Sequence, residues 1–157
     1  MSKLLVVVDM QYDFVMPDGA LYVPGAEKLL VPMIQHVFSF DRQDVVFTRD
    51  THHSRAYSTS VEAKEFPPHC LWDTKGHQLL IPFRGSDRID KTVFDVWADE
   101  RCKPYLEWRA QRYDEIEIVG VAADYCVRYA YEGFKQRGFN VHVNPALTVG
   151  IKENPFQ

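Results

Sequence analysis

Long apolar stretches are absent from this sequence of 157 residues. The longest one, residues 4–8, is far shorter than the roughly 20 apolar residues of a helix that spans a bilayer, so we expect no membrane association. Clusters of Lys and Arg are absent as well: no basic run is longer than a dipeptide, and the net charge is −4. This charge pattern argues against a protein that binds nucleic acid.

Cysteine is scarce, with single residues at positions 70, 102 and 126. No Cys-x-x-Cys pair occurs, which argues against a structural zinc knuckle. The amino-terminal residues lack the charged segment, the apolar segment and the cleavage site of a secretory signal. An odd number of cysteines without such a signal predicts reduced thiols and a cytoplasmic protein.

The remaining composition is that of an ordinary globular protein, 46% hydrophobic and 25% charged. The length fits one compact domain, residues 1–157. Runs rich in β-branched and aliphatic residues predict strands at residues 4–8, 44–48, 115–121 and 138–143. Apolar residues at helical spacing predict helices at residues 26–38, 99–112 and 126–137. Alternating strands and helices predict an α/β fold with a doubly wound sheet.

Reactive side chains follow three of the predicted strands. Asp9 follows the first, Asp50 the second, and Cys126 the third after a short loop. Because ligands of open α/β sheets bind at the carboxyl ends of the strands, we expect these groups at one edge of the sheet.

Cys126 is a candidate nucleophile. The start of a helix lowers the pKa of a thiol, and a nearby carboxylate can accept the proton that the thiol loses. A buried structural cysteine is the alternative interpretation of the same residue.

A candidate metal site combines Asp50, His52 and His69. One carboxylate and two imidazoles can hold a divalent cation and leave coordination positions open. His53 and His77 show that this part of the chain is rich in histidine, so accidental proximity is the alternative.

Several segments resemble the nicotinamidase branch of the isochorismatase-like cysteine hydrolases. Residues 9–14 (Asp-Met-Gln-Tyr-Asp-Phe) resemble the family's opening, and residues 49–52 and 66–70 resemble its metal-binding segments. Asp90-Lys91 matches the position of the family's lysine, and residues 120–127 (Gly-Val-Ala-Ala-Asp-Tyr-Cys-Val) resemble the nucleophile motif. The resemblance covers nearly the whole chain and implies a three-layer αβα fold with a mainly parallel, six-stranded sheet.

The resemblance also implies roles for individual residues. Asp9, Lys91 and Cys126 would be the catalytic triad, and the N–H groups of Ala122 and Cys126 would bind the oxyanion after a cis peptide bond. Asp50, His52 and His69 would hold the metal, zinc or alternatively iron or manganese. Glu62 would be a fourth ligand, although it could equally be a solvated carboxylate like Glu65.

Rings are expected around the substrate. Phe14 and Phe66 fall where the family sandwiches its substrate, and Trp97 would close the pocket. Without the resemblance, both phenylalanines would be interpreted as core residues.

The implied reaction converts nicotinamide to nicotinate and ammonia through a thioester, as part of NAD salvage. The expected partner is a small-molecule amide, and a homo-oligomer is left open. One alternative is another hydrolase of the same superfamily that acts on a different amide, a carbamoyl compound or an isochorismate-type ether. Another is an inactive protein that uses the pocket to bind a small ligand. Ala123, where the family usually has threonine, and Asn144-Pro145, where it often has aspartate, depart from the family pattern.

Overall fold

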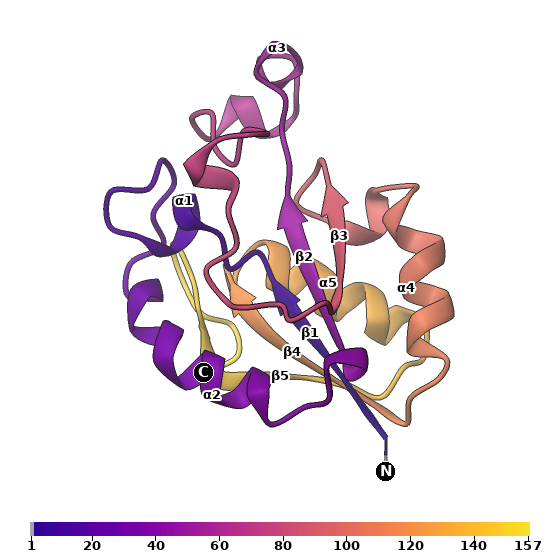
Figure 1. Cartoon of the computed structure of the whole chain (residues 1–157). Coiled ribbons are helices and arrows are strands. Elements are labelled where there is room, and N and C mark those ends of the chain that lie inside the picture. Colours follow the sequence, from indigo (N-terminus) through magenta and orange to yellow (C-terminus); the bar gives the residue numbers. More distant parts are fainter. Residues whose placement is uncertain (1) are drawn as a thin grey trace.

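The computed structural model describes residues 2–157 (Figure 1). Within this range five strands form one sheet in the order β3-β2-β1-β4-β5, and each neighbouring pair is parallel. The strands are β1 (Lys3–Val8), β2 (Val45–Asp50), β3 (Asp87–Lys91), β4 (Glu115–Val121) and β5 (Val141–Val149). The α-helices are α1 (Tyr12–Val15), α2 (Leu30–Phe38), α3 (Ser54–Tyr57), α4 (Cys102–Ala110) and α5 (Cys126–Gln136). Short 3₁₀ helices are η1 (Ala26–Leu29), η2 (Arg42–Asp44), η3 (Glu62–Lys64), η4 (Lys75–His77) and η5 (Val96–Ala98).

The sheet is buried on both faces, which explains its continuous apolar strands. Along β1, Leu5 and Val7 point to the face that η1 and α2 cover, whereas Leu4 and Val6 point to the face that α4 and α5 cover. Figure 1 shows α2 in front of the sheet and α5 behind it. The predicted three-layer αβα fold is confirmed.

The number of strands differs from the prediction. The resemblance implied six strands, and the part of the chain that the structure describes forms five. Residues after β5 turn back instead of adding a strand, because the carboxylate of Asp124 accepts hydrogen bonds from the N–H groups of Ile151, Lys152 and Glu153. These donors are therefore not available to a sheet ladder.

Strand β3 was not predicted from the sequence. Its residues Asp-Arg-Ile-Asp-Lys are mostly charged, and only the last of them is buried. β3 lies at the edge of the sheet and pairs with β2 alone. Charged residues are common on edge strands, where they oppose pairing with other chains, and they hide the apolar pattern by which a strand is recognised.

Several helices and strands begin or end at other residues than the sequence predicted, for local reasons. The predicted helix 26–38 is split into η1 and α2, and Pro32 lies in the first turn of α2, where its missing N–H is not needed. The helix predicted from residue 99 begins as α4 at Cys102, because the carboxylate of Asp99 accepts hydrogen bonds from the N–H groups of Arg101 and Cys102. Strand β5 continues through Pro145, which an edge strand with an irregular register tolerates.

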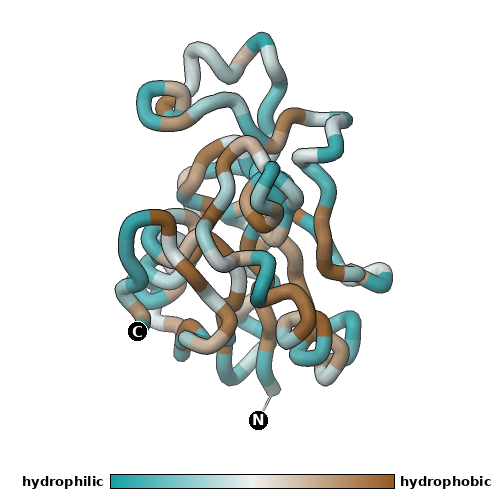
Figure 2. Tube along the Cα trace, turned by 90° about the vertical axis from the view of Figure 1, so that its left-hand side faces the viewer, coloured by the Kyte–Doolittle hydropathy of each residue, from teal (hydrophilic) through white to brown (hydrophobic). Residues whose placement is uncertain are grey.

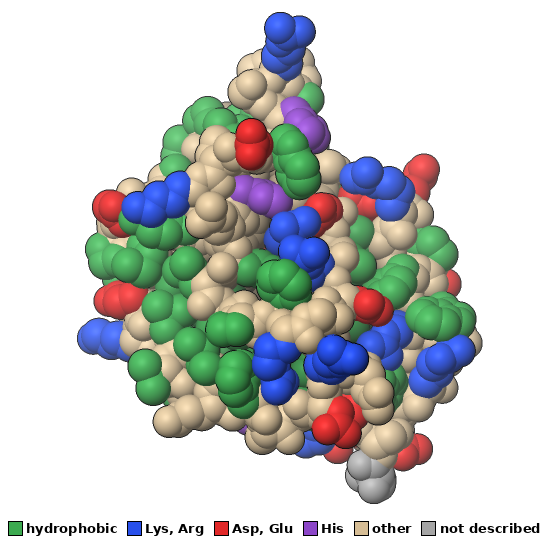
Figure 3. Space-filling model, in the orientation of Figure 1, with side chains coloured by type: hydrophobic (Ala, Val, Ile, Leu, Met, Phe, Trp, Pro, Cys, Tyr) green, Lys and Arg blue, Asp and Glu red, His purple; other side chains and the backbone are tan. Residues whose placement is uncertain are grey.

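The first part of the segment between β2 and β3 lies above the carboxyl ends of the strands, with α3 at its tip, and its last part runs back across the sheet to the start of β3 (Figure 1). The tube of this upper part is mostly hydrophilic or neutral in Figure 2. Acidic and basic side chains are interspersed over the face of the molecule that Figure 3 shows. Among the described residues, no helix has the length and apolar character needed to cross a bilayer.

Candidate active site

Four reactive side chains converge at the carboxyl edge of the sheet. Asp9 directly follows β1, Asp50 ends β2, Lys91 ends β3, and Cys126 opens α5 after the loop that follows β4. All four are buried, with exposed fractions between 0% and 3%. The parallel register of the strands brings these residues to one place, as the sequence predicted for Asp9, Asp50 and Cys126.

Lys91 stands at the centre of this group. Its Nζ lies 2.8 Å from Asp9 Oδ2, 3.2 Å from Asp50 Oδ1 and 3.5 Å from Cys126 Sγ. Asp9 adopts a left-handed backbone conformation with a φ of 49°, and the hydroxyl of Thr48 donates a 2.6 Å hydrogen bond to its Oδ1. One ammonium therefore bridges a carboxylate beside the thiol and a carboxylate of the neighbouring histidine cluster.

Burial determines the resting protonation of Cys126 and Asp9. It raises the pKa of the Cys126 thiol well above its usual value, and the Lys91 ammonium opposes this rise. Burial also raises the pKa of Asp9, with Lys91 again acting in the opposite direction. The sequence-based expectation that the start of α5 favours the thiolate is wrong for the resting site, because desolvation of the sulfur has the larger effect. A neutral thiol therefore lies beside a carboxylate that is a stronger base than an exposed aspartate.

Replacing Lys91 with Met should move the alkylation of Cys126 to higher pH. Lys91 lowers the pKa of the thiol, so its removal raises that pKa further, and less thiolate is present at any pH below it. The measurement is the rate of Cys126 alkylation against pH, followed by peptide mass spectrometry. Lys103→Met, on the exposed side of α4, is the matched control. An unchanged profile in the Lys91 variant would show that this ammonium does not act on the thiol.

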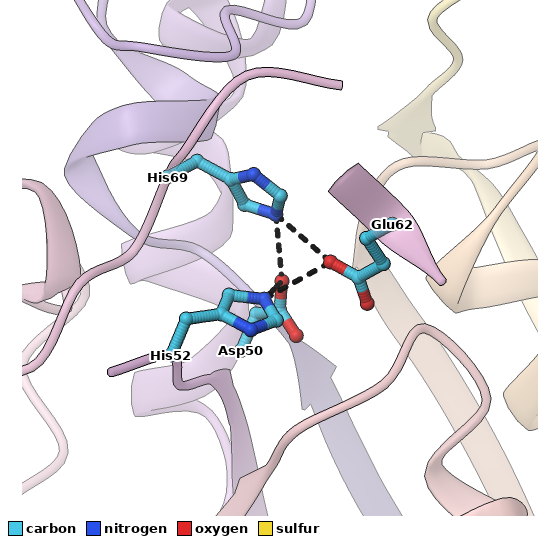
Figure 4. A group of neighbouring side chains, drawn as sticks. All are labelled: Asp50, His52, Glu62 and His69. Atoms are coloured by element: carbon cyan, nitrogen blue, oxygen red, sulfur yellow. Dashed lines mark hydrogen bonds and ion pairs between the residues drawn. The ribbon is translucent and has the colours of Figure 1, made fainter. Parts of the chain in front are cut away.

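Next to Lys91 lies a cluster of two imidazoles and two carboxylates (Figure 4). His52 Nε2 lies 2.9 Å from both Asp50 Oδ2 and Glu62 Oε2, and His69 Nε2 lies 3.0 Å and 3.1 Å from the same two oxygens. One ligand atom from each of the four residues lies within 4.8 Å of the others, and all four residues are buried. The structure therefore brings together Asp50, His52, His69 and Glu62, and it places Glu62 inside the cluster, whereas Glu65 is exposed.

The charges of this cluster fit a bound cation. Burial opposes a charge on each histidine, yet hydrogen bonds to Asp50 and Glu62 raise the pKa of His52 to about 9 and that of His69 to about 10. Among the described residues, the buried Oε1 of Glu62 has no hydrogen-bond partner. The two carboxylates thus favour a positive charge between them, and one carboxylate oxygen has no partner among residues 2–157. Two carboxylates and two imidazoles are a suitable set of ligands for a divalent metal.

Neighbouring groups fix the orientation of the candidate metal ligands. His69 Nδ1 lies 2.8 Å from the carbonyl oxygen of Pro67, so this bond holds the ring with Nε2 toward the cluster. The buried amide of Gln11 donates to the carbonyl oxygen of Asp50 at 2.8 Å and accepts from its N–H at 2.8 Å. The hydroxyl of Tyr57 donates to the carbonyl oxygens of Phe66 and Pro67. Sequence reasoning gave Gln11 and Tyr57 no role, because their partners are distant backbone groups.

Three rings lie over the site. Phe66, Phe94 and Tyr125, which we call the aromatic triangle, are mutually in contact, with ring centroids 5.4–5.6 Å apart. Phe94 is also stacked on His69 at 6.4 Å, and Phe14 lies 5.4 Å from the same imidazole. Phe14 thus borders the four-residue cluster, and Phe66 contacts Phe94, which stacks on His69. Phe94 and Tyr125 were not predicted from the sequence.

Trp97 occupies a different place from the one expected. Its indole packs edge-to-face on Phe134 at 4.8 Å, and its Nε1 donates to the carbonyl oxygen of Ala130. Both partners belong to α5, so the ring contributes to the core between η5 and that helix. Phe94, three residues earlier, is the ring of this segment that reaches the site.

The loop before Cys126 presents backbone donors. Among the described residues, the N–H groups of Ala122 and Cys126 donate no backbone hydrogen bond in this loop, whereas the N–H groups of Ala123 and Tyr125 are paired. The Val121–Ala122 peptide bond is cis, as the resemblance implied. Gly120 precedes this loop with a φ of 120°, and a Cβ there would lie 2.2 Å from the carbonyl oxygen of Val8, so only glycine fits.

Comparisons with known proteins agree with this geometry. The family model for the isochorismatase domain matches residues 3–153. A nicotinamidase of Saccharomyces cerevisiae is 30% identical, over 98% of this chain and 90% of the relative. A nicotinamidase/pyrazinamidase of Mycobacterium tuberculosis is 30% identical, over 95% of this chain and 87% of the relative. The structure of a Pyrococcus horikoshii pyrazinamidase in complex with zinc superposes with a TM-score of 0.82 at 28% identity, covering 96% of this chain and 88% of that one.

Proposed function

The chain belongs to the isochorismatase family, and we propose that it is a metal-dependent amidohydrolase that converts nicotinamide to nicotinate and ammonia. The observation that carries the proposal is the position of Lys91, which contacts the candidate nucleophile Cys126, the base Asp9 and the metal-site carboxylate Asp50 at once. An amide-cleaving thiol and a metal site thus share one buried edge. The similar nicotinamidases support the substrate.

The first step is attack of the thiol on the amide. Asp9 takes the proton of Cys126 as the sulfur forms a bond to the carboxamide carbon. Lys91 stays protonated and stabilises the charge that moves between Asp9 and the sulfur; its pKa is raised well above the usual value because Asp50 and Asp9 outweigh the effect of burial. The N–H groups of Ala122 and Cys126 donate to the oxyanion that develops on the substrate.

The second half of the reaction returns the enzyme to its resting state. Protonated Asp9 gives its proton to the departing nitrogen, the C–N bond breaks, and ammonia leaves a thioester on Cys126. A water molecule then attacks the thioester and Asp9 accepts a proton from it. The C–S bond breaks, the carboxylic acid leaves, and Asp9 returns its proton to the thiolate of Cys126. The raised pKa of Asp9 suits a group that must both take and return a proton.

Asp50, His52, Glu62 and His69 would hold the metal, for which we propose zinc from the nitrogen and oxygen donors and from the zinc-bound relative. When bound, it would supply a Lewis-acidic position that accepts the ring nitrogen of the pyridine. Phe14 and Phe66 would flank the ring of the substrate. The place of this reaction in NAD salvage and the cytoplasmic location are predictions from the sequence.

Ammonia release across a small panel of compounds tests the function. We expect nicotinamide and pyrazinamide to be hydrolysed with a kcat/KM roughly 10- to 100-fold above that of an open-chain carbamoyl compound, since the open chain offers no ring to the aromatic side chains. An isochorismate-type ether should not be hydrolysed, which is checked by chromatography because that reaction would release no ammonia. A preference for the carbamoyl compound would instead favour a different member of the family.

A further inference from the structure

The residues that follow β5 are tied to the nucleophile loop. Asp124 lies two residues before Cys126, is only 4% exposed, and accepts hydrogen bonds of 2.8–3.1 Å from the N–H groups of Ile151, Lys152 and Glu153. The N–H of Ala123 also donates to the carbonyl oxygen of Val149 at 2.8 Å. These bonds hold residues 149–153 in one position beside the site.

This anchored segment carries the side chain of Lys152 to the metal-binding loop. Lys152 Nζ lies 2.9 Å from Glu65 Oε1, and the hydroxyl of Tyr125 donates a 2.8 Å hydrogen bond to the same oxygen. We call Lys152, Glu65 and Tyr125 the rim latch. It joins three segments that are distant in the sequence: the loop of Glu62, the nucleophile loop and the residues after β5.

The rim latch is joined to the aromatic triangle at two of its corners. Glu65 precedes Phe66, and Tyr125 is itself a corner of the triangle. Cys126, the residue after Tyr125, is 3% exposed, and Asp9 and Lys91 are 0% and 1% exposed. Because the reactive groups are closed off from solvent in this structure, a substrate reaches Cys126 only when part of its cover moves.

We propose that the rim latch controls access to Cys126, with Lys152 as the residue whose release lets the aromatic triangle open. The ion pair between Lys152 and Glu65 is exposed, whereas the hydrogen bonds to Asp124 are buried. Lys152 and Glu65 side chains are 66% and 47% exposed, so their pairing is weak and readily broken. The bonds to Asp124 are buried and persist, so the backbone after β5 stays in place while the side chain of Lys152 swings away.

The inference concerns the active site of the proposed function and rests on that function. Its test uses no substrate, so the two can fail separately. The probe is iodoacetamide, a small neutral reagent, with labelling of each cysteine followed by peptide mass spectrometry at several pH values. Lys152→Met should raise the rate at Cys126 about two- to fivefold, the range expected for loss of an exposed ion pair. Cys102, which is buried and bonded to the carbonyl oxygen of Asp90, should keep its rate, and the pH midpoint at Cys126 should not move.

Lys64→Met is the matched control, because Lys64 lies on the same loop as Glu65 and makes no ion pair among residues 2–157. Glu65→Gln should accelerate labelling like Lys152→Met, and the double variant should be no faster than either single one, since both remove the same pair. Equal Cys126 rates in Lys152→Met and Lys64→Met overturn the proposal. A similar acceleration at Cys102 also overturns it, since that reports general loosening. If labelling responds as expected but nicotinamide is not hydrolysed, the proposed function fails and the rim latch stands.

Discussion

Replacing Cys126 with Ala is expected to reduce amide hydrolysis on the order of 10⁴-fold or more, the scale at which covalent enzymes lose activity with their nucleophile. Asp9 and Lys91 would remain, but neither can form the thioester. The fold should survive, because Ala is a good helix former at the first position of α5 and the sulfur contacts Lys91 at a long 3.5 Å. Ammonia release and far-ultraviolet circular dichroism measure the two effects separately.

Cys102→Ala is the matched control for that variant. Cys102 is also buried and also begins a helix, but its Sγ donates to the carbonyl oxygen of Asp90 at 3.3 Å and faces no carboxylate of the triad. We expect nearly full turnover with a modest loss of stability, about 1 kcal/mol. Turnover in Cys126→Ala above about one per cent of the wild-type value would refute the covalent mechanism.

The fold was predictable wherever burial on both faces leaves a continuous apolar pattern. Strands β1, β2 and β4 have that pattern, and their parallel order accounts for the meeting of Asp9, Asp50 and Cys126. Strand β3 lacks it, so Lys91 could be placed only through the resemblance to a family. The extent of β5 was hidden by Pro145, which is normally a strand breaker.

Parts of the site could not be predicted because they depend on contacts between distant segments. Nothing near Phe94 or Tyr125 in the sequence indicates that these two rings meet or that Phe94 stacks on His69. Trp97, in the same segment as Phe94, faces α5 instead. The protonation of Cys126 is a similar case. Its position at the start of a helix is visible in the sequence, but the burial that raises the pKa of the thiol is a property of the folded chain.

Loss of the metal site should have the second large effect. His52→Ala removes a ligand and leaves Asp50 and Glu62 facing each other with one histidine fewer. Since changes to the supporting partners of metal ligands already cost roughly 10- to 100-fold, we expect loss of a ligand to lower nicotinamide turnover by at least about 100-fold. Metal content, measured by elemental analysis, should fall in parallel.

The neighbouring histidine provides the control. His53 is exposed and lies outside the cluster of four ligands, so His53→Ala should retain both metal and activity. Glu62→Gln should bind metal more weakly, because an amide oxygen replaces a charged ligand while the shape of the side chain is kept. Full metal content in Glu62→Gln at limiting metal would show that this carboxylate is not a ligand.

Chelation separates a role of the metal in binding the substrate from a role in holding the fold. Removal of the metal should reduce turnover of nicotinamide and pyrazinamide, whose ring nitrogens can bind to a cation. Benzamide has the same ring size but no ring nitrogen, so it should be a poor substrate even when metal is present, and chelation should hardly change its turnover. If chelation lowered all three rates equally, the metal would stabilise the structure of the site and would not bind the ring nitrogen of the substrate. If metal-free protein hydrolysed nicotinamide at the full rate, the cluster of Asp50, His52, Glu62 and His69 would not be a functional metal site.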